Sequence, residues 1–356
     1  MDIEKFLEEK APLIDKAIEK YIPRKFAKDS VLFQVTPPVY SYNLETIDKT
    51  IADPTWDILD RGGKRWRPAL FLLICEALGK KEAYHTDFAA IPEVIHNGTL
   101  VIDDIEDSSE LRRGKPCTYK LYGVDIAVNV GNAMYYMPLL ALMTKEVDLS
   151  AEVLCGVYEV YVQEMINLSM GQAMDIAWHR GLANADNVNE KDYLQMCAYK
   201  TGTLARMAAK MAAVISGAEK MLVDKLGRFA ESIGVAFQMQ DDILDLTGQE
   251  FAKKKGGVGQ DITEGKRTLM VIYTLKNANA TDKKRLIEIL NMHTNDQKLR
   301  DEAIALMQKY HAIEHTAQTA EKIVADSWNE VNQLLPTPEA KEKIKMFSEF
   351  LIKRNM

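Results

Sequence analysis

The feature that most constrains the fold of this chain is the spacing of its apolar residues. Apolar side chains recur at three- and four-residue intervals almost throughout, which is the period of one face of an α-helix. Strand-like alternation flanked by turn residues is nearly absent. The 17 methionines suit packing between helices because their side chains are flexible. The pattern therefore predicts an all-α fold.

Proline- and glycine-rich segments divide the predicted helices. "VTPPVYSYN" is a break, because paired prolines cannot continue a helix, and "DRGGKRWRP" is a second break. The last helix is expected to begin at Pro338, with Thr337 as its N-cap. No low-complexity linker divides the chain, so we expect one domain over 1–356, with an N-terminal helical extension (1–45), a core (60–275) and C-terminal helices (280–356). Helices are predicted over 1–21, 69–78, 87–107, 124–145, 151–179, 190–216, 219–246 and 268–277.

Composition and charge narrow the classes of protein that this chain can belong to. The formal net charge of −7 gives no global attraction for nucleic acid. The four cysteines show no CxxC spacing, which argues against a disulfide scaffold or a zinc site. The most apolar run, "ALFLLIC", is far shorter than the roughly 20 residues that span a bilayer. We expect a soluble, cytoplasmic protein with no transmembrane segment and no nucleic-acid partner.

Two aspartate motifs end apolar helices in this prediction. "DDIED" places Asp103 and Asp107 four residues apart, and "DDILD" repeats that spacing with Asp241 and Asp245. On a helix each pair shares one face, where like charges repel unless a cation lies between them. Carboxylate oxygens suit Mg²⁺, which binds through a few carboxylates together with substrate phosphates. One such motif is often only a solvated helix end, but two copies behind apolar helices indicate a metal-dependent function.

Basic residues are interleaved with the aspartates. Arginine makes bidentate contacts with phosphate oxygens, and lysine supplies a point charge. Each is by itself more often a solvated surface charge, but together they indicate two kinds of anion site, one reached through metal ions and one formed directly by Lys and Arg. The positions are Lys64, Arg65, Arg67, Arg112, Arg113, Lys115, Lys200, Lys253, Lys254, Lys255, Lys266 and Arg267.

The two kinds of anion site differ in their chemistry. A metal-chelated diphosphate is a good leaving group, because the cations take up charge as the C–O bond breaks. A diphosphate held only by Lys and Arg is anchored without equal activation. One substrate would therefore ionise, and the other would act as the nucleophile.

Six ordered motifs resemble those of the trans-isoprenyl diphosphate synthases, also called the polyprenyl synthetase family, most closely the geranylgeranyl diphosphate synthases. They are "GGKRWRP", "IHNGTLVIDDIEDSSELRRGKP", "GQAMDIAW", "KTGTL", "FQMQDDILDLTG" and "GQDITEGKRT". Trp66 stands where the family has a smaller apolar residue, and the first 45 residues are longer than in compact members. The resemblance implies a bundle of long helices around a deep cavity, the isoprenoid synthase fold, and a homodimer.

The resemblance also implies roles for individual residues. Asp103, Asp107 and Asp241 would bind Mg²⁺, with Asp245 close by, and three ions would be present with substrate bound. The allylic diphosphate (dimethylallyl, geranyl or farnesyl) would be held by Arg112, Lys200 and Lys266. Isopentenyl diphosphate would be held by Lys64, Arg67, His96 and Arg113, with Gly63 letting the backbone approach.

Further roles follow from the same resemblance. The Lys200 carbonyl, Thr201 and Gln238 would lie beside the developing allylic cation. Asp175 would position a lysine, and Lys255 would close over the diphosphate. The isopentenyl double bond would attack the allylic carbon, and the proton would leave to the released diphosphate, so no side chain need be a strong base. Water must be excluded, since it would quench the cation.

Product length depends on what stops the growing chain. Gly98 lies five residues before Asp103, about 7.5 Å along a helix, and both Gly98 and Thr99 are too small to form a floor at farnesyl length. Tyr135 and Tyr136 align with an aromatic pair that blocks the deeper tunnel in eukaryote-like geranylgeranyl diphosphate synthases, although ordinary core packing explains them equally well. We expect a geranylgeranyl product, with a product of 25 carbons or more, or farnesyl diphosphate, as alternatives.

Two other functions remain open at this point. A class I terpene cyclase also ionises a diphosphate behind an aspartate motif, but its second motif has an Asn/Ser/Glu pattern and it has no need of "GGKRWRP". A non-catalytic partner subunit typically loses aspartates or basic residues, whereas both clusters are complete here. A purely structural cation-binding protein is less well supported still.

Overall fold

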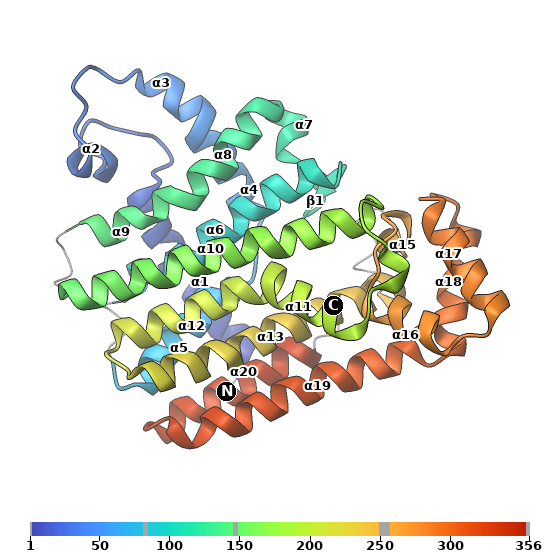
Figure 1. The fold of residues 1–356 in the computed structure, drawn as a ribbon. Coiled ribbons are helices and arrows are strands. Elements are labelled where there is room, and N and C mark those ends of the chain that lie inside the picture. The colour runs from blue at the N-terminus through green and yellow to red at the C-terminus, as the bar shows by residue number, and fades with distance from the viewer. Residues whose placement is uncertain (1, 81–84, 145–148, 249–256, 354–356) are drawn as a thin grey trace. The chain divides into compact units, whose positions relative to one another are not determined.

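The computed structural model describes residues 2–80, 85–144, 149–248 and 257–353. These residues form two compact units (Figure 1). Unit 1 comprises Met1–Tyr161, Met207–Leu226 and Gln333–Met346. Unit 2 comprises Val162–Arg206, Gly227–Asn332 and Phe347–Met356.

Almost every described element is a helix, which confirms the predicted all-α class. The first helices along the chain are α1 (Ile3–Tyr21), α2 (Val31–Val35), α3 (Leu44–Ile47), α4 (Asp53–Asp60), α5 (Trp66–Ala77), α6 (Thr86–Glu106), α7 (Thr118–Tyr122), α8 (Val124–Tyr136), α9 (Leu140–Met143) and α10 (Ala151–His179). The others are α11 (Glu190–Cys197), α12 (Thr203–Ile215), α13 (Lys220–Thr247), α15 (Gln260–Thr263), α16 (Leu269–Asn277), α17 (Ala280–Asn291), α18 (Gln297–Lys309), α19 (Ala312–Val331) and α20 (Pro338–Lys353).

Most predicted helices lie where the apolar spacing placed them, and the last one begins at Pro338 as expected. Two predictions needed correction. The helix predicted over 124–145 ends at Tyr136 and continues as the 3₁₀ turn η3 (Met137–Leu139), because Pro138 cannot donate a helical hydrogen bond. The helix predicted over 190–216 is divided by a π-helical turn, η5 (Ala198–Gly202). The "RRGKP" segment forms a two-stranded hairpin of β1 (Leu111–Arg112) and β2 (Lys115–Pro116).

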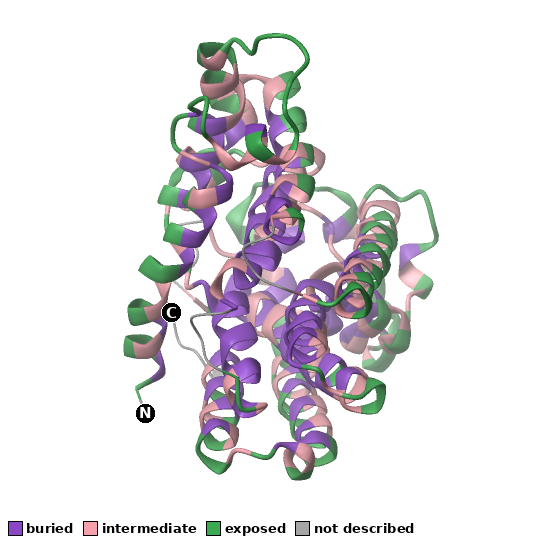
Figure 2. Ribbon diagram, turned by 90° about the vertical axis from the view of Figure 1, so that its left-hand side faces the viewer, coloured by how far each residue is buried: buried purple, intermediate pink, exposed green. Residues whose placement is uncertain are grey.

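The core of unit 1 forms where α6 crosses α8 at close range. A Cβ at Gly98 of α6 would lie 2.8 Å from Cβ of Met134, and a Cβ at Gly131 of α8 would lie 2.5 Å from Cδ1 of Ile102. Glycine at both positions therefore lets the two backbones approach. In α5, every residue except Glu76 is buried, so this helix forms the centre of the unit, and Figure 2 shows buried and exposed sides along the helices.

Unit 2 has its own apolar core. Residues of α16, α17, α18 and α19, including Val271, Leu290, Met307 and Ala312, pack in one cluster. A buried ion-pair group accompanies it, in which Nε of Arg206 donates to both oxygens of Glu164, at 2.9 and 2.8 Å, and Nη1 contacts Glu231. These two carboxylates offset the cost of burying the Arg206 guanidinium.

One described segment, Val124–Met143, is long and apolar enough to cross a membrane by length and composition alone. Core helices of soluble proteins pass the same test, and 44% of its most apolar window is buried. The segment coincides with α8 and α9, which pack against α6.

Candidate active site

The first aspartate motif occupies the C-terminal turn of α6. Asp107 caps this helix, and its N–H donates to the carbonyl of Asp103 at 2.8 Å, so the two carboxylates do stand one turn apart. Both residues are half-buried, whereas Asp104 between them is buried. Asp103 and Asp107 are thus the members of this motif that retain access to a ligand.

Arg112 is tied back to this motif by the hairpin. Nε of Arg112 lies 2.8 Å from Oδ1 of Asp104, and Nη2 lies 3.8 Å from Oδ2 of Asp103. Burial by itself lowers the pKa of the Arg112 guanidinium, but these carboxylates outweigh it and raise the pKa above its usual value. Nη1 of Arg61 supports the hairpin by donating to the carbonyls of Arg112 and Pro116, at 3.2 and 2.9 Å. The hairpin therefore holds a permanently charged arginine beside the aspartates.

A second cationic group in unit 1 gathers around Gly63, which has a φ of +142°. A Cβ at Gly63 would lie 3.1 Å from Nη1 of Arg65 and 3.2 Å from Nη2 of Arg113. The guanidinium of Arg67 lies over the indole of Trp66, 4.4 Å from the ring centroid. Cation–π contact of this kind favours Arg, which gives the unusual Trp66 a physical role. Nζ of Lys64 lies 3.8 Å from a carboxylate oxygen of Glu4 in α1.

Burial and the neighbouring positive charges lower the pKa values of His96 and Arg113. The pKa of His96 is lowered well below 6.5, first by burial and then by Arg67, Arg113 and other arginines. Burial, together with Arg65 and Arg112, lowers the pKa of Arg113 to about 10. At neutral pH His96 is therefore a neutral hydrogen-bonding group among cations, and Arg113 is still charged.

The second aspartate motif lies in α13 of unit 2, and its members differ in environment. Asp241 is half-buried. Asp242 is buried and accepts hydrogen bonds from Oη of Tyr193 at 2.7 Å and from Nε2 of Gln238 at 2.8 Å. Asp245 is also buried, and its Oδ2 accepts from the backbone N–H of Asp261 at 3.1 Å. Asp241 is accordingly the most accessible carboxylate of this motif.

Lys200 and Thr201 lie in the π-helical turn η5. A π-helical turn opens the normal pattern of backbone hydrogen bonds and is frequent at functional sites. Nζ of Lys200 lies 2.5 Å from Oδ2 of Asp175, which is the lysine contact expected of Asp175. The hydroxyl of Thr201 donates to Oε1 of Gln238 at 2.9 Å. Side-chain contacts thus join Lys200 to α10 and Thr201 to Gln238 of α13.

The remaining predicted binding residues are Lys266 and Lys255. Nζ of Lys266 lies 2.5 Å from Glu264 and 3.7 Å from Asp261. Lys255 lies outside the described residues.

The chain-length candidates are Gly98 and Thr99 of α6 and Tyr135 and Tyr136 of α8. Gly98 faces α8, where a Cβ would also lie 3.3 Å from Cε1 of Tyr135, so the pair is in contact across the helix crossing. The Thr99 hydroxyl donates to the carbonyl of His96 at 2.7 Å. Tyr135 is half-buried and its carbonyl accepts from Oη of Tyr161 at 2.9 Å, whereas Tyr136 is 65% exposed. Tyr135 thus lies against the helix that carries Asp103, at Gly98.

The donor set fits magnesium rather than a protein-only metal site. Within the described residues no group of three or more His, Cys, Asp and Glu side chains could hold a metal ion by itself. Mg²⁺ does not require one, because it commonly binds through one or two carboxylates plus substrate phosphates and water. The pairs Asp103/Asp107 and Asp241/Asp245 supply hard oxygen ligands of that kind.

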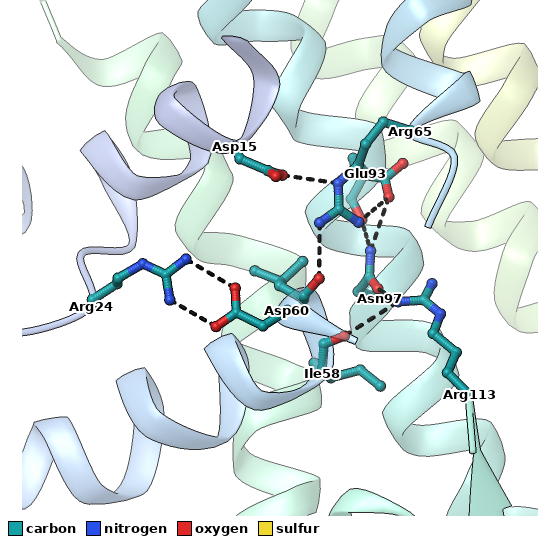
Figure 3. Close-up of polar contacts among 9 residues, drawn as sticks. Asp15, Arg24, Ile58, Asp60, Arg65, Glu93, Asn97 and Arg113 are labelled. Carbon is teal, nitrogen blue, oxygen red and sulfur yellow. Dashed lines mark hydrogen bonds and ion pairs between the residues drawn. The ribbon is translucent and has the colours of Figure 1, made fainter. Parts of the chain in front are cut away.

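Several residues that order the site were not identified from the sequence. Asp104 binds Arg112, and Tyr193 and Asp242 fix Gln238. Asn97 contacts Arg113, as Figure 3 shows. Asp242 follows Gln238 by four residues, a helical spacing that is visible in the sequence. The other contacts join residues that lie far apart in the chain or across a turn, so helical spacing carries no signal for them. Asn97 has a local signal in its position directly after His96.

Comparison with known proteins identifies the family. The family model "Polyprenyl synthetase" matches residues 48–307. The chain is 33% identical over 318 residues to a short chain isoprenyl diphosphate synthase of Methanothermobacter thermautotrophicus, covering 87% of this chain and 94% of the relative. It is 29% identical over 302 residues to a geranylfarnesyl diphosphate synthase of Aeropyrum pernix, covering 83% and 92%.

A solved structure agrees with these relatives. The crystal structure of geranylgeranyl pyrophosphate synthetase from Pyrococcus horikoshii matches with a TM-score of 0.81 and 30% identity, covering 99% of this chain and 98% of that one. The matched region contains both aspartate motifs, the Gly63 segment and the Lys200 turn. The chain therefore belongs to the polyprenyl synthetase family and is a trans-isoprenyl diphosphate synthase.

Proposed function

We propose that this enzyme condenses allylic diphosphates with isopentenyl diphosphate and releases geranylgeranyl diphosphate. The observation that carries the proposal is the complete set of charged groups: two aspartate pairs at one-turn spacing, and the separate cationic group around Gly63. Members of this family use Mg²⁺ to ionise a diphosphate. We propose three ions per active site, bound by Asp103, Asp107, Asp241 and Asp245.

When bound, the metal would neutralise the charge that develops on the departing diphosphate. Arg112, Lys200 and Lys266 would bind the same diphosphate directly, and Lys255 would add to them. The Lys200 carbonyl, Thr201 and Gln238 would place oxygen dipoles beside the allylic carbon as positive charge develops there. The hydrogen bonds from Thr201 to Gln238 and from Gln238 to Asp242 support this role, because a dipole stabilises charge best when it is already oriented.

Isopentenyl diphosphate would be held by Lys64, Arg67, His96 and Arg113 beside Gly63. Neutral His96 supports this assignment, since an imidazole that does not add charge can donate a hydrogen bond to a phosphate oxygen. The released diphosphate would accept the proton lost after C–C bond formation. No carboxylate of the site is then required to act as a strong base.

Product length follows from Tyr135, which we propose as the floor of the product site. Its ring lies against Gly98, one and a half turns before Asp103. The alternative is a product of 25 carbons, favoured by the relative named geranylfarnesyl diphosphate synthase. The names of similar proteins thus include two product lengths, geranylgeranyl and geranylfarnesyl.

We further propose that the chain acts as a single cytoplasmic domain and a homodimer. Within α8, Val124, Val128 and Tyr136 are exposed on a helix that is otherwise largely apolar. Exposed apolar faces of this kind commonly mark protein–protein interfaces. Analytical ultracentrifugation of the wild-type chain and of a Val128→Glu variant would test this, because a charged residue in the interface should shift the population to monomer.

One assay tests the proposed activity. The purified chain is incubated with Mg²⁺, labelled isopentenyl diphosphate and dimethylallyl, geranyl or farnesyl diphosphate, and the products are separated by chain length. We expect label in a geranylgeranyl product. Failure to incorporate label with every allylic partner would refute the proposal, and a longer or shorter product would correct its length.

A further inference from the structure

A chain of five side chains in unit 1 leads from α1 to Arg113 (Figure 3). Oδ1 of Asp15 accepts from Nε of Arg65 at 2.9 Å, and Nη1 of Arg65 donates to Oε1 of Glu93 at 3.0 Å. Nδ2 of Asn97 donates to the same Oε1 at 3.1 Å. Oδ1 of Asn97 then accepts from Nη1 of Arg113 at 3.2 Å. Each side chain of the path is therefore hydrogen-bonded to the next.

The interior of this path is buried. Arg65 is 4% exposed, Glu93 is 2% exposed and Asn97 is fully buried. The polar atoms of Glu93 and Asn97 are taken up by Arg65, by Arg113 and by each other, so these two residues would act on a diphosphate through Arg113. Buried charges are costly unless they are paired and hydrogen-bonded, so the matching of Arg65 with Glu93 and Asp15 makes the arrangement tenable.

Asn97 can adopt only one amide orientation in this environment. Nδ2 faces two acceptors of Glu93, the carbonyl at 2.9 Å and Oε1 at 3.1 Å. With the amide reversed, its oxygen would face those two oxygens and its nitrogen would face a guanidinium, which also only donates. Glu93 thus fixes which end of Asn97 meets Arg113.

Arg113 is restrained from both ends. Its backbone is left-handed, with a φ of +52°, at the turn of the hairpin. Nη1 donates to Oδ1 of Asn97 and to the carbonyl of Ile58, each at 3.2 Å, so this corner of the guanidinium is committed to protein acceptors. Nη2 lies on the side of Gly63. Neighbouring protein groups therefore set the direction in which the Arg113 guanidinium points.

We propose that Asn97 and Glu93 are positioning residues for the isopentenyl diphosphate site: they hold the Arg113 guanidinium in the orientation that binds the second diphosphate. This inference rests on the proposed function, which assigns Arg113 to that substrate. Guanidinium–phosphate contacts are strong when both N–H groups align with the oxygens, so a rotated fork binds less well although its charge is unchanged.

The test is steady-state kinetics of Asn97→Ala, which removes the amide and leaves every charge in place. The Michaelis constant for isopentenyl diphosphate should rise about ten-fold, the loss expected for one hydrogen bond to a charged group. The turnover number and the Michaelis constant for the allylic substrate should stay within about two-fold, because the amide contacts neither the aspartates nor Lys200. Asn97→Ser, which is too short to join both partners, serves if the alanine variant folds poorly.

The matched control is Asp60→Asn. Asp60 forms a bidentate ion pair with Arg24, at 2.8 and 2.9 Å, close to the same path but not part of it (Figure 3). Its loss should leave both Michaelis constants unchanged.

A double-mutant cycle separates positioning from general damage. Arg113→Ala alone should raise the Michaelis constant for isopentenyl diphosphate, and adding Asn97→Ala should then have no further effect, because the group it positions is absent. Multiplicative effects in the double variant, or an Asn97→Ala enzyme with wild-type constants, would overturn the inference. Absence of incorporation by the wild-type chain would instead refute the proposed function.

Discussion

Gly171 of α10 lies directly against the backbone of Lys200. A Cβ at Gly171 would lie 2.3 Å from the Lys200 nitrogen and 2.5 Å from the Tyr199 carbonyl carbon. On the other side, Gly234 of α13 approaches Gly202, where a Cβ would lie 2.7 Å from the Gly202 Cα. Two glycines therefore admit the π-helical turn that presents Lys200 and Thr201.

Gly171→Ala should lower both stability and turnover. The added methyl meets backbone atoms that cannot rotate away, so the turn must shift, at a cost of about 1–3 kcal/mol in the free energy of unfolding. Gly156→Ala, in the same helix, is the control, because its Cβ meets only a methyl group of Val214 at 3.1 Å. Urea denaturation and kinetics of both variants check this, and equal behaviour of the two would contradict it.

Tyr135→Ala should lengthen the product, whereas Tyr136→Ala should leave it unchanged. Tyr135 is half-buried and contacts the α6 backbone at Gly98, whereas Tyr136 is 65% exposed. Chromatography of the products measures both. A longer product from Tyr136→Ala alone would move the floor to the exposed face of α8, and no change in either would place it elsewhere.

His96→Gln should reduce the loss of stability at acidic pH. The unfolded chain binds a proton at His96 near pH 6.5, but the folded chain binds it only at lower pH. The free energy of unfolding therefore falls as the pH drops below about 6.5, by about 1.4 kcal/mol per pH unit for this group. Urea denaturation at pH 7.5 and 5.5 should show a smaller difference for the variant, and an identical difference would mean that His96 titrates normally.

Tyr193→Phe should lower turnover more than substrate affinity. The Tyr193 hydroxyl holds Asp242, which holds the Gln238 amide that accepts from Thr201. Without the hydroxyl the amide is less well oriented toward the developing cation, and we expect turnover to fall about ten-fold. Ser232→Ala is the control. Ser232 lies on α13, as Gln238 and Asp242 do, but its hydroxyl contacts Ser327 of α19, outside this path. A rise in either Michaelis constant with unchanged turnover would argue against this role.

Removal of Mg²⁺ with a chelator should abolish turnover, and added Mg²⁺ should restore it. Asp103→Asn should reduce turnover by several orders of magnitude, since it removes a metal ligand from the ionising diphosphate. Arg113→Ala should chiefly raise the Michaelis constant for isopentenyl diphosphate. Equal effects of the two substitutions on both substrates would contradict the division between the two anion sites.

The sequence by itself determined the helical class, most helix positions and the chemical character of the site. Apolar spacing is a local property of the chain, and so are the four-residue intervals that place Asp103 and Asp107 on one face. The contact between Gly98 and Tyr135 could not be predicted from the sequence, because the two residues meet across a helix crossing that no periodicity encodes.

Tertiary structure decided which charged residues are buried and what each one contacts. The sequence shows Asp241, Asp242 and Asp245 as equivalent carboxylates, but packing leaves the first half-buried and buries the second against Tyr193. Likewise Arg65 and Arg67 stand in one motif, yet Arg65 is committed to Glu93 and Asp15, whereas Arg67 lies over Trp66. The free energy of a charge depends on its distance from partners and from water, and both distances exist only once the helices have packed.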